Sequence, residues 1–362
     1  MTMHEAIPST MAAVLLTGYG DLDALDYRDD VAVPTPGRGE VLIKVAAAGV
    51  NNTDINTRTG WYAREVTGSS GDSATSGAAD GTSGWSGDLQ FPRIQGADCC
   101  GHIVAVGPDV DAARVGERVI VATMQTAYRG GDPFATTVFG SEHDGAFAEY
   151  TVAHATETHA VDCTWTDIEL ASIPCAYSTA ENMLHRIDLG AERVLVTGAS
   201  GGVGSAAVQL AKRRGATVVA VASASKAGEV ERLGADQVVD RDTDLVAQFG
   251  ENSFDVVVDV VAGPAWAHVT RLLRIGGRYI TAGAIAGPIV ELDVRDLYLK
   301  DLTLKGSTYQ DPVVFENLVG YIERGEITPV IAATYPLQEI AAAQTAFLAK
   351  GFVGKIVLSV GS

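Results

Sequence analysis

A glycine-rich turn is the feature of this sequence that most limits its fold. Residues 198–204 read Gly-Ala-Ser-Gly-Gly-Val-Gly, after an apolar run at 193–197 and before a helical apolar pattern at 205–215. In this strand–turn–helix context, glycines let the backbone approach a dinucleotide pyrophosphate, and the helix start offers N–H groups to the phosphates. We therefore predict a dinucleotide site formed by Gly201, Gly202, Val203 and Gly204. The alternative is a tight turn in an unrelated α/β fold.

The segments around this turn alternate between strand and helix patterns. The strand patterns are apolar and the helix patterns lie between them, at 217–222, 226–233, 237–240, 254–261, 266–275 and 278–282. Nearly all-apolar strands indicate a parallel sheet covered on both faces. The first 150 residues show short strand patterns broken by Gly and Pro, and strand patterns return at 302–306 and 354–359. We predict the fold class α/β plus β.

The change from short strand patterns to alternating strand and helix patterns, and back, predicts the domain division. A Rossmann-type dinucleotide-binding domain is expected over 163–305, inserted into a β-rich catalytic domain over 11–162 and 306–362. A chain of 362 residues is long enough for two such domains.

Composition excludes several classes of partner. The formal net charge is −19, whereas nucleic acids and anionic membranes attract clustered Lys and Arg. We find no apolar stretch near the ~20 residues of a membrane span, and no signal-peptide pattern at the N-terminus. The four cysteines show neither CxxC spacing nor the density of a disulfide framework: Cys99, Cys100, Cys163 and Cys175. We expect a cytoplasmic protein that acts on a small molecule, without nucleic acid or membrane partners.

The choice of cofactor depends on the residues after the second strand of the α/β unit. An NAD site usually places Asp or Glu about 20 residues beyond the turn. Here Ser223 takes that place, followed by Lys226, and Arg241 follows the third strand. A hydroxyl and cations suit a 2′-phosphate, so NADPH is predicted over NADH. The alternative is that Ser223 and Lys226 form an ordinary helix cap and first turn.

At this point the sequence resembles the medium-chain dehydrogenase/reductase superfamily over essentially its whole length. The matching segments are 49–54, 96–101, 116–119, 178–180, the glycine turn and 354–357. The resemblance implies a GroES-like catalytic domain beside a Rossmann domain, an active site in the cleft between them, and a homodimer or homotetramer. It also places Thr179 at a position that contacts the cofactor near the nicotinamide.

The resemblance also raises the question of zinc. Zinc alcohol dehydrogenases of this family have a Cys where this chain has Asn51 and a His-Glu pair where it has Ala97-Asp98. Their third ligand, a Cys, falls at Cys175. Two of the three main ligands are therefore missing. One Cys cannot hold Zn²⁺ in a three-ligand catalytic site. The family's structural zinc lobe needs four cysteines, and 121–147 contains none. We expect no zinc at either site. The alternative is a relocated site that uses Asp98, Cys99 or Cys175 with His102 or His143.

Without zinc, the sequence resembles the quinone oxidoreductase-like branch. That resemblance implies hydride transfer from NADPH to a quinone or an α,β-unsaturated carbonyl. Asn51 is expected near the nicotinamide, and Asn51 and Tyr62 are the expected hydrogen-bond donors to the substrate. The alternative for Tyr62 is that it only flanks the insertion that follows it. Asp54 is expected as a structural acceptor, and Asn56 replaces a tyrosine common in this branch. Two other functions stay open, an alcohol dehydrogenase and a non-catalytic NADPH-binding protein.

One segment interrupts the β-rich pattern. Twelve of the twenty residues at 68–87 are Gly or Ser, with Trp85 among them. Such a composition buries too little apolar surface to offset its ordering cost, so we expect a flexible surface loop. It is either an insertion without a role or a lid over a nearby site. The wider insertion, 63–90, follows the expected pocket-lining segment, and we expect it to influence specificity.

Overall fold

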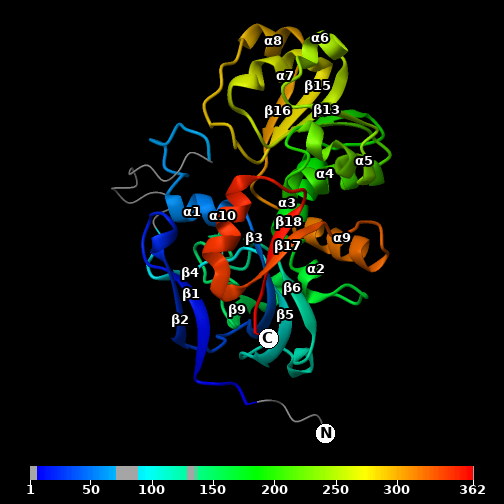
Figure 1. Ribbon diagram of the computed structural model, residues 1–362. Helices are drawn as coiled ribbons and strands as arrows, with labels where there is room; N and C mark the ends of the chain where they lie inside the picture. The colour runs from blue at the N-terminus through cyan, green and yellow to red at the C-terminus, as the bar shows by residue number, and fades with distance from the viewer. Residues whose placement is uncertain (1–5, 71–88, 129–134, 136, 362) are drawn as a thin grey trace.

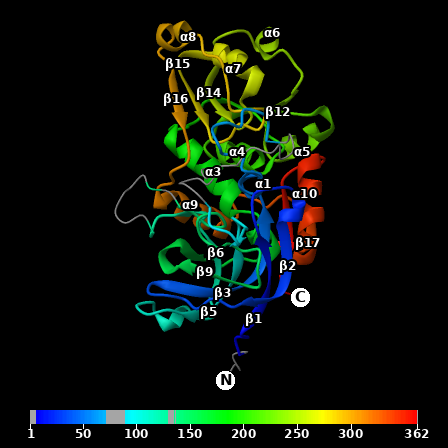
Figure 2. The ribbon, with the colours of Figure 1, turned by 90° about the vertical axis from the view of Figure 1, so that its left-hand side faces the viewer.

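The protein has a β-rich lobe built from both ends of the chain and an α/β lobe built from its middle (Figures 1 and 2). The structure, a computed structural model, describes residues 6–70, 89–128, 135 and 137–361. Trp85 and most of the Gly/Ser-rich segment therefore lie outside the described residues.

The α/β lobe contains, within the described residues, a six-stranded sheet of order β13-β12-β11-β14-β15-β16, in which every neighbouring pair is parallel. Relative to the chain this order is 3-2-1-4-5-6, that of a doubly wound dinucleotide-binding sheet. The predicted fold class is confirmed. The strands are β11 (Arg193–Val196), β12 (Thr217–Ala222), β13 (Gln237–Asp240), β14 (Phe254–Asp259), β15 (Leu273–Thr281) and β16 (Thr303–Gly306).

Helices of the α/β lobe connect these strands, as a parallel sheet requires. The connecting helices are α4 (Gly202–Arg213), α5 (Ala227–Arg232), α6 (Leu245–Phe249), α7 (Trp266–Leu272) and α8 (Val294–Leu299), while α3 (Pro174–Arg186) precedes β11 and α9 (Pro312–Glu323) follows β16. The predicted helix over 266–275 is wrong at its end, because Leu273 already pairs with Phe254 and begins β15. Helix α4 begins three residues before the predicted start, inside the glycine turn.

The β-rich lobe is organised around a mixed sheet of order β10-β6-β5-β3-β18-β17, with β9 also paired to β3. Its longer elements are β1 (Thr10–Leu16), β2 (Leu25–Ala32), β3 (Glu40–Val50), α1 (Asn52–Thr59), β5 (Cys100–Val106), β6 (Arg118–Val121), β9 (Tyr150–His154), β17 (Ile331–Pro336), α10 (Ile340–Ala349) and β18 (Lys355–Ser359). The short ones are β4 (Arg93–Ile94), β7 (Met124–Gln125), β8 (Thr137–Val138), β10 (Thr158–Ala160) and α2 (Asp167–Leu170).

Two features of this arrangement position the site. Strand β18 pairs antiparallel with β3 and sets Ile356 opposite Val50, so β18 begins beside the residues that precede α1. Helix α3 joins the lobes, because one buried apolar cluster contains its side chains together with Ala47 and Cys100 of the β-rich sheet. The end of β3 and the beginnings of β18 and α3 therefore meet where the two lobes face each other.

Candidate functional site

A cavity of about 700 Å³ lies over the carboxyl ends of β11, β12 and β14. In a doubly wound sheet, ligands bind at this edge, where the strand order reverses on either side of the first strand. The cavity is lined by seven of the predicted cofactor residues: Gly201, Gly202, Val203, Gly204, Ser223, Lys226 and Arg241. The sequence-predicted turn and the cations beyond it thus face one space.

The glycine turn has two kinds of glycine. Gly198 has φ +60°, and a Cβ on Gly204 would lie 2.2 Å from the carbonyl oxygen of Gly198, so the fold itself excludes side chains there. A Cβ on Gly201 would meet only that same oxygen, at 3.5 Å. The fold does not require a glycine at 201, and its lack of a side chain leaves the turn open to a ligand, as a bound pyrophosphate needs.

Ser223 and Lys226 follow β12 at the 3₁₀ turn η4 (Ala224–Lys226). Ser223 stands at the start of this turn, but its side chain makes no capping hydrogen bond, and its Oγ lies 3.2 Å from Oγ of Ser225. The structure therefore shows no hydrogen bond that would support the alternative in which Ser223 serves as a helix cap. Burial, and secondarily the charge of Arg241, lowers the pKa of Lys226.

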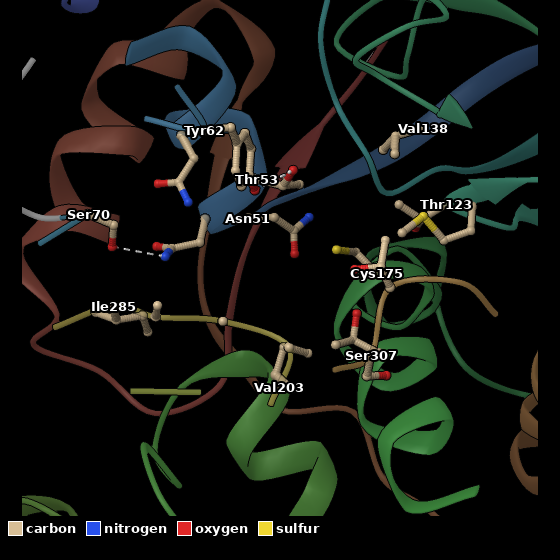
Figure 3. Close-up of a pocket in the computed structure, with 18 of the residues that line it drawn as sticks. Asn51, Thr53, Tyr62, Ser70, Thr123, Val138, Cys175, Val203, Ile285 and Ser307 are labelled. Atoms are coloured by element: carbon tan, nitrogen blue, oxygen red, sulfur yellow. Dashed lines mark hydrogen bonds between the residues drawn. The ribbon is translucent and has the colours of Figure 1, made fainter. Parts of the chain in front are cut away.

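A smaller cavity of about 140 Å³ adjoins the first. Figure 3 shows Asn51, Thr53 and Tyr62 on one side of it, and Val203 at the start of α4 on another. Thr179, the eighth predicted cofactor residue, lines this smaller cavity. Asn51 and Val203 line both cavities, so a ligand on the glycine turn would extend directly into the smaller space.

Tyr62 places a phenol at this cavity. Its hydroxyl donates to Oγ1 of Thr53 at 3.3 Å, and burial raises the pKa of the phenol to about 12. The group is therefore protonated at neutral pH and able to donate a hydrogen bond. The structure brings Tyr62 and Asn51 to one cavity, although they are eleven residues apart and belong to different local segments.

The Asn51 amide is fixed by contacts at both ends. Its Nδ2 donates to Oδ2 of Asp98 at 2.8 Å, and its Oδ1 accepts from Nζ of Lys355. A hydrogen bond from Asn51 to a substrate would need the Asp98 contact, or the longer contact to the carbonyl of Gly49, to open. The expected donor role of Asn51 stays a prediction, and its position at the junction of the two cavities is what the structure shows.

Asp54 acts as a structural acceptor, as the sequence predicted. Its carboxylate accepts from the backbone N–H of Asn51 at 2.7 Å and of Ala97 at 3.2 Å. Burial, and next the nearby charge of Asp98, raises the pKa of Asp54 to about 7 despite these bonds.

The sequence did not predict the role of Lys355. Its ammonium is buried, 2.9 Å from Oδ2 of Asp98, and it also donates to the carbonyl of Val50 at 3.0 Å. The Lys355 stem lies against the glycine turn, since a Cβ on Gly202 would come 2.8 Å from its Cδ. The terminal segment 354–357 contains this lysine, but nothing in that segment indicates its contacts with Asp98 and Asn51.

Asp98 and Cys175, which stand where the family resemblance places zinc ligands, contact other groups here. Oδ1 of Asp98 accepts from the backbone N–H of Cys175 at 2.6 Å, and burial, then Asp98, raises the pKa of the Cys175 thiol. In the part of the chain that the structure describes, no three His, Cys, Asp or Glu side chains gather in a way that could hold a metal ion. The cation held by Asn51 and Asp98 is Lys355.

One side of the smaller cavity is lined by polar residues that the sequence analysis did not predict, among them Asn182, Ser307 and Gln310. Nδ2 of Asn182 donates to Oγ of Ser307 at 2.8 Å, and Nε2 of Gln310 donates to Oγ of Ser178 at 3.0 Å. These residues join α3 to the loop after β16, and nothing in their sequence spacing indicates the contact.

The described start of the insertion reaches the same cavity. Oγ of Ser70 accepts from Nδ2 of Asn52 at 3.3 Å, and the backbone N–H of Ser70 donates to the carbonyl of Ile285 at 3.0 Å. Among the described residues we find no helix with the length and apolar character needed to span a membrane.

Comparison with known proteins gives consistent matches. The description "Alcohol dehydrogenase GroES-like domain" matches residues 37–162, and "Zinc-binding dehydrogenase" matches 202–324. A quinone oxidoreductase from Lama guanicoe is 31% identical over 96% of this chain and 97% of its own. The chloroplastic NADPH-dependent alkenal/one oxidoreductase of Arabidopsis thaliana is 28% identical over 99% of this chain and 82% of its own. A crystal structure of a "putative alcohol dehydrogenase" from Sinorhizobium meliloti 1021 has TM-score 0.88 and 47% identity, covering 98% of each chain.

Proposed function

Since the chain belongs to the medium-chain dehydrogenase/reductase superfamily, in its quinone oxidoreductase-like branch, we propose that it is an oxidoreductase that uses NADPH to reduce quinones or α,β-unsaturated carbonyl compounds. The observation that carries this proposal is the pair of adjoining cavities. The larger contains the glycine turn, and the smaller is lined by the phenol of Tyr62, with Asn51 and Val203 at their junction.

The residues of the larger cavity fit a dinucleotide. The turn offers backbone N–H groups at the start of α4, and Gly201 leaves space above it. Lys226 and Arg241 add positive charge to a cavity in a strongly acidic chain, and the place of an NAD-type carboxylate is taken by Ser223. This donor set supports NADPH over NADH. Thr179 and Val203 would border the nicotinamide, since they line the smaller cavity beside Asn51.

When bound, the reduced nicotinamide supplies a hydride to the substrate. The task of the chain is to orient the acceptor and to stabilise negative charge on its carbonyl oxygen. Tyr62 is the proposed donor to that oxygen, because its phenol lines the smaller cavity, is protonated at neutral pH and bonds the neutral hydroxyl of Thr53. Met124, Val138 and Ile285 give the cavity apolar walls that limit water. The Lys355–Asp98 pair keeps Asn51 in place.

We propose that this reaction proceeds without zinc. The support is the donor set, since Asn51 and Ala97 stand at two of the three ligand positions used by zinc relatives. The relocated alternative has little support, because burial raises the pKa values of the thiols of Cys99 and Cys175, which disfavours the thiolate that binds metal.

We also propose a cytoplasmic homodimer or homotetramer. All four cysteines are free, which fits a reducing compartment. Strand β16 is an edge of the parallel sheet, and near it lie strongly exposed apolar side chains, Ile275, Tyr298 and Leu299. Exposed apolar groups beside an unpaired edge favour association with a second copy. The predicted domain division, 11–162 and 306–362 against 163–305, is kept as part of this proposal.

The alternatives make different predictions. An alcohol dehydrogenase, favoured by the name of the Sinorhizobium meliloti protein, would oxidise simple alcohols with NADP⁺ or NAD⁺. A non-catalytic NADPH-binding protein would bind the cofactor without turnover. The test is to measure NADPH oxidation with a panel of quinones, enones, aldehydes and alcohols, with metal analysis on the same sample. Turnover restricted to alcohols, or stoichiometric zinc, would reject the proposal.

A further inference from the structure

The segment 60–70, which follows α1, runs from the β-rich lobe to the α/β lobe. It begins at Gly60, the left-handed residue that ends α1 at φ +69°. At its far end the backbone N–H of Ser70 donates to the carbonyl of Ile285 at 3.0 Å. Ile285 lies in the loop after β15, and its own N–H donates to the carbonyl of Val260, just beyond β14, at 3.3 Å. The bond from Ser70 therefore ties a segment of the β-rich lobe to the edge of the parallel sheet.

Side-chain contacts hold this segment in its path. Nε1 of Trp61 donates to the carbonyl of Gly68 at 3.1 Å, which folds the segment back on its own start. Nδ2 of Asn52, in α1, donates to Oγ of Ser70 at 3.3 Å, and Oδ1 of Asn52 accepts from Nζ of Lys350 at 3.1 Å. Because an ammonium can only donate, the Lys350 contact turns the amide nitrogen of Asn52 toward Ser70. The segment is thus fixed both from within and from α1.

The segment approaches the loop after β15 at a second point. Gly287 of this loop has φ +124°, and a Cβ built on it would lie 3.5 Å from the carbonyl oxygen of Thr67. Thr67 and Ser70 thus both lie against residues 285–287. Contact at two points makes an extended attachment, not one isolated hydrogen bond at the end of the segment.

The same segment forms one wall of the smaller cavity. Trp61, Tyr62 and Ser70 line this cavity, and so does Ile285. Figure 3 shows Ser70 and Ile285 on one side of the cavity and Thr123 on the other. Breaking the bond between Ser70 and Ile285 would let this wall move away from the α/β lobe, and the cavity would then open on that side.

The closed cavity is small. Its volume is about 140 Å³, close to the engineered protein cavity of about 150 Å³ that takes one benzene ring. A polycyclic acceptor needs more room than this. While the segment stays attached to Ile285, the smaller cavity therefore suits a ligand group of about the size of one six-membered ring.

We propose that the segment 60–70 is a strap that the N–H of Ser70 pins to Ile285, and that this strap sets the size of the acceptor. The substrate class is then a monocyclic quinone or enone, or an open-chain enone of similar bulk. Since the pin is a backbone bond, it depends on the N–H at position 70 and not on the serine side chain. The inference rests on the proposed function in taking the smaller cavity as the acceptor site.

The test compares cyclohex-2-enone with its 4-phenyl derivative as acceptors for the NADPH-loaded full chain. Ser70→Pro removes the N–H that bonds Ile285. Ser70→Ala is the matched control, because it keeps this N–H and removes only the hydroxyl that bonds Asn52. Trp61→Phe is a second variant, which loses the indole N–H that folds the strap and leaves position 70 unchanged.

The measured quantity is the ratio of kcat/KM for the smaller enone to kcat/KM for the larger. Dividing the ratio of a variant by that of the wild type cancels the intrinsic reactivity of the two enones. Loss of one hydrogen bond predicts a fall of about three- to tenfold in Ser70→Pro and Trp61→Phe, and of less than about 1.5-fold in Ser70→Ala. A fall below about twofold in both Ser70→Pro and Trp61→Phe would overturn the strap. So would a fall in Ser70→Ala as large as in Ser70→Pro.

Two measurements need no turnover. Backbone amides at 285–287 should exchange with deuterium faster in Ser70→Pro than in Ser70→Ala, because the loop loses its attachment; equal exchange would overturn the pin. The wild type loaded with NADP⁺ should bind cyclohexanone more tightly than 4-phenylcyclohexanone, and the reverse order would overturn the size limit. If the wild type reduces no enone or quinone, the proposed function fails, and these two measurements still decide whether the strap exists and limits size.

Discussion

Replacing Lys355 by methionine tests the buried pair behind Asn51. The substitution keeps most of the apolar stem that lies against Gly202 and removes the ammonium that bonds Asp98, Asn51 and Val50. Asp98 is fully buried, so its carboxylate would keep only the N–H donors of Cys175 and Asn51. An uncompensated charge would remain beneath the junction of the two cavities.

The expected loss follows from this geometry. Removing one partner of a buried ion pair costs about 3–5 kcal/mol. For a unit of roughly 200 residues, 1 kcal/mol corresponds to a shift of about 2–4 °C in melting temperature, so Lys355→Met should lower it by roughly 6–20 °C. Replacing both partners, as Lys355→Met with Asp98→Asn, removes the stranded charge and should recover part of that loss.

The assay is thermal and urea unfolding of the two single variants and the double variant, followed by circular dichroism at pH 7. The account predicts that the double variant is more stable than Lys355→Met alone. A loss below about 1 kcal/mol in Lys355→Met, or strictly additive effects of the two substitutions, would refute the view that the pair anchors this region.

Three further predictions concern the cofactor and the reaction. Gly204→Ala should weaken NADPH binding at least about tenfold, because its Cβ would lie 2.2 Å from the carbonyl oxygen of Gly198; unchanged affinity by fluorescence titration would contradict this. Tyr62→Phe should lower kcat about 100-fold with NADPH affinity unchanged, and a kcat near wild type would exclude Tyr62 as the donor. NADPH affinity should be full below about pH 8 and should fall as pH rises further, because Lys350, whose pKa is about 8 when free, must hold its proton to bind a phosphate. Lys226, Arg241, Asp242 and Asp244 line the same cavity as Lys350, and a profile flat to pH 10, or one unchanged in Lys350→Met, would contradict this prediction.

Local patterns predicted much of the α/β lobe. The glycine turn and the apolar strands around it indicated a doubly wound sheet, because parallel strands buried on both faces have a distinct composition. The β-rich lobe was harder, since its sheet joins β3 to β18, whose residues are about 300 positions apart. Helices α9 and α10 and strand β17 were not predicted. For α10 the reason is that its Ala-rich run differs little in polarity from one helix face to the other.

The site shows the same limit. Asn51, Tyr62 and the residues after β12 could be proposed from motifs, since their functional positions follow local segments. Lys350 and Lys355 could not, because their meaning depends on side chains brought to them from other elements: Asn52 and Lys226 for one, Asp98 and Asn51 for the other. A lysine in a terminal segment indicates nothing until its neighbours are known.

The central claim is that this chain reduces conjugated carbonyls or quinones with NADPH bound on the glycine turn. The most direct measurement is the rate of NADPH oxidation by the purified full chain with a quinone and an enone, in parallel with NADH. The account predicts turnover with at least one of these acceptors, a clear preference for NADPH, and no dependence on added or removed zinc. Tight NADPH binding without turnover of any acceptor, or turnover only of alcohols with a zinc requirement, would contradict it.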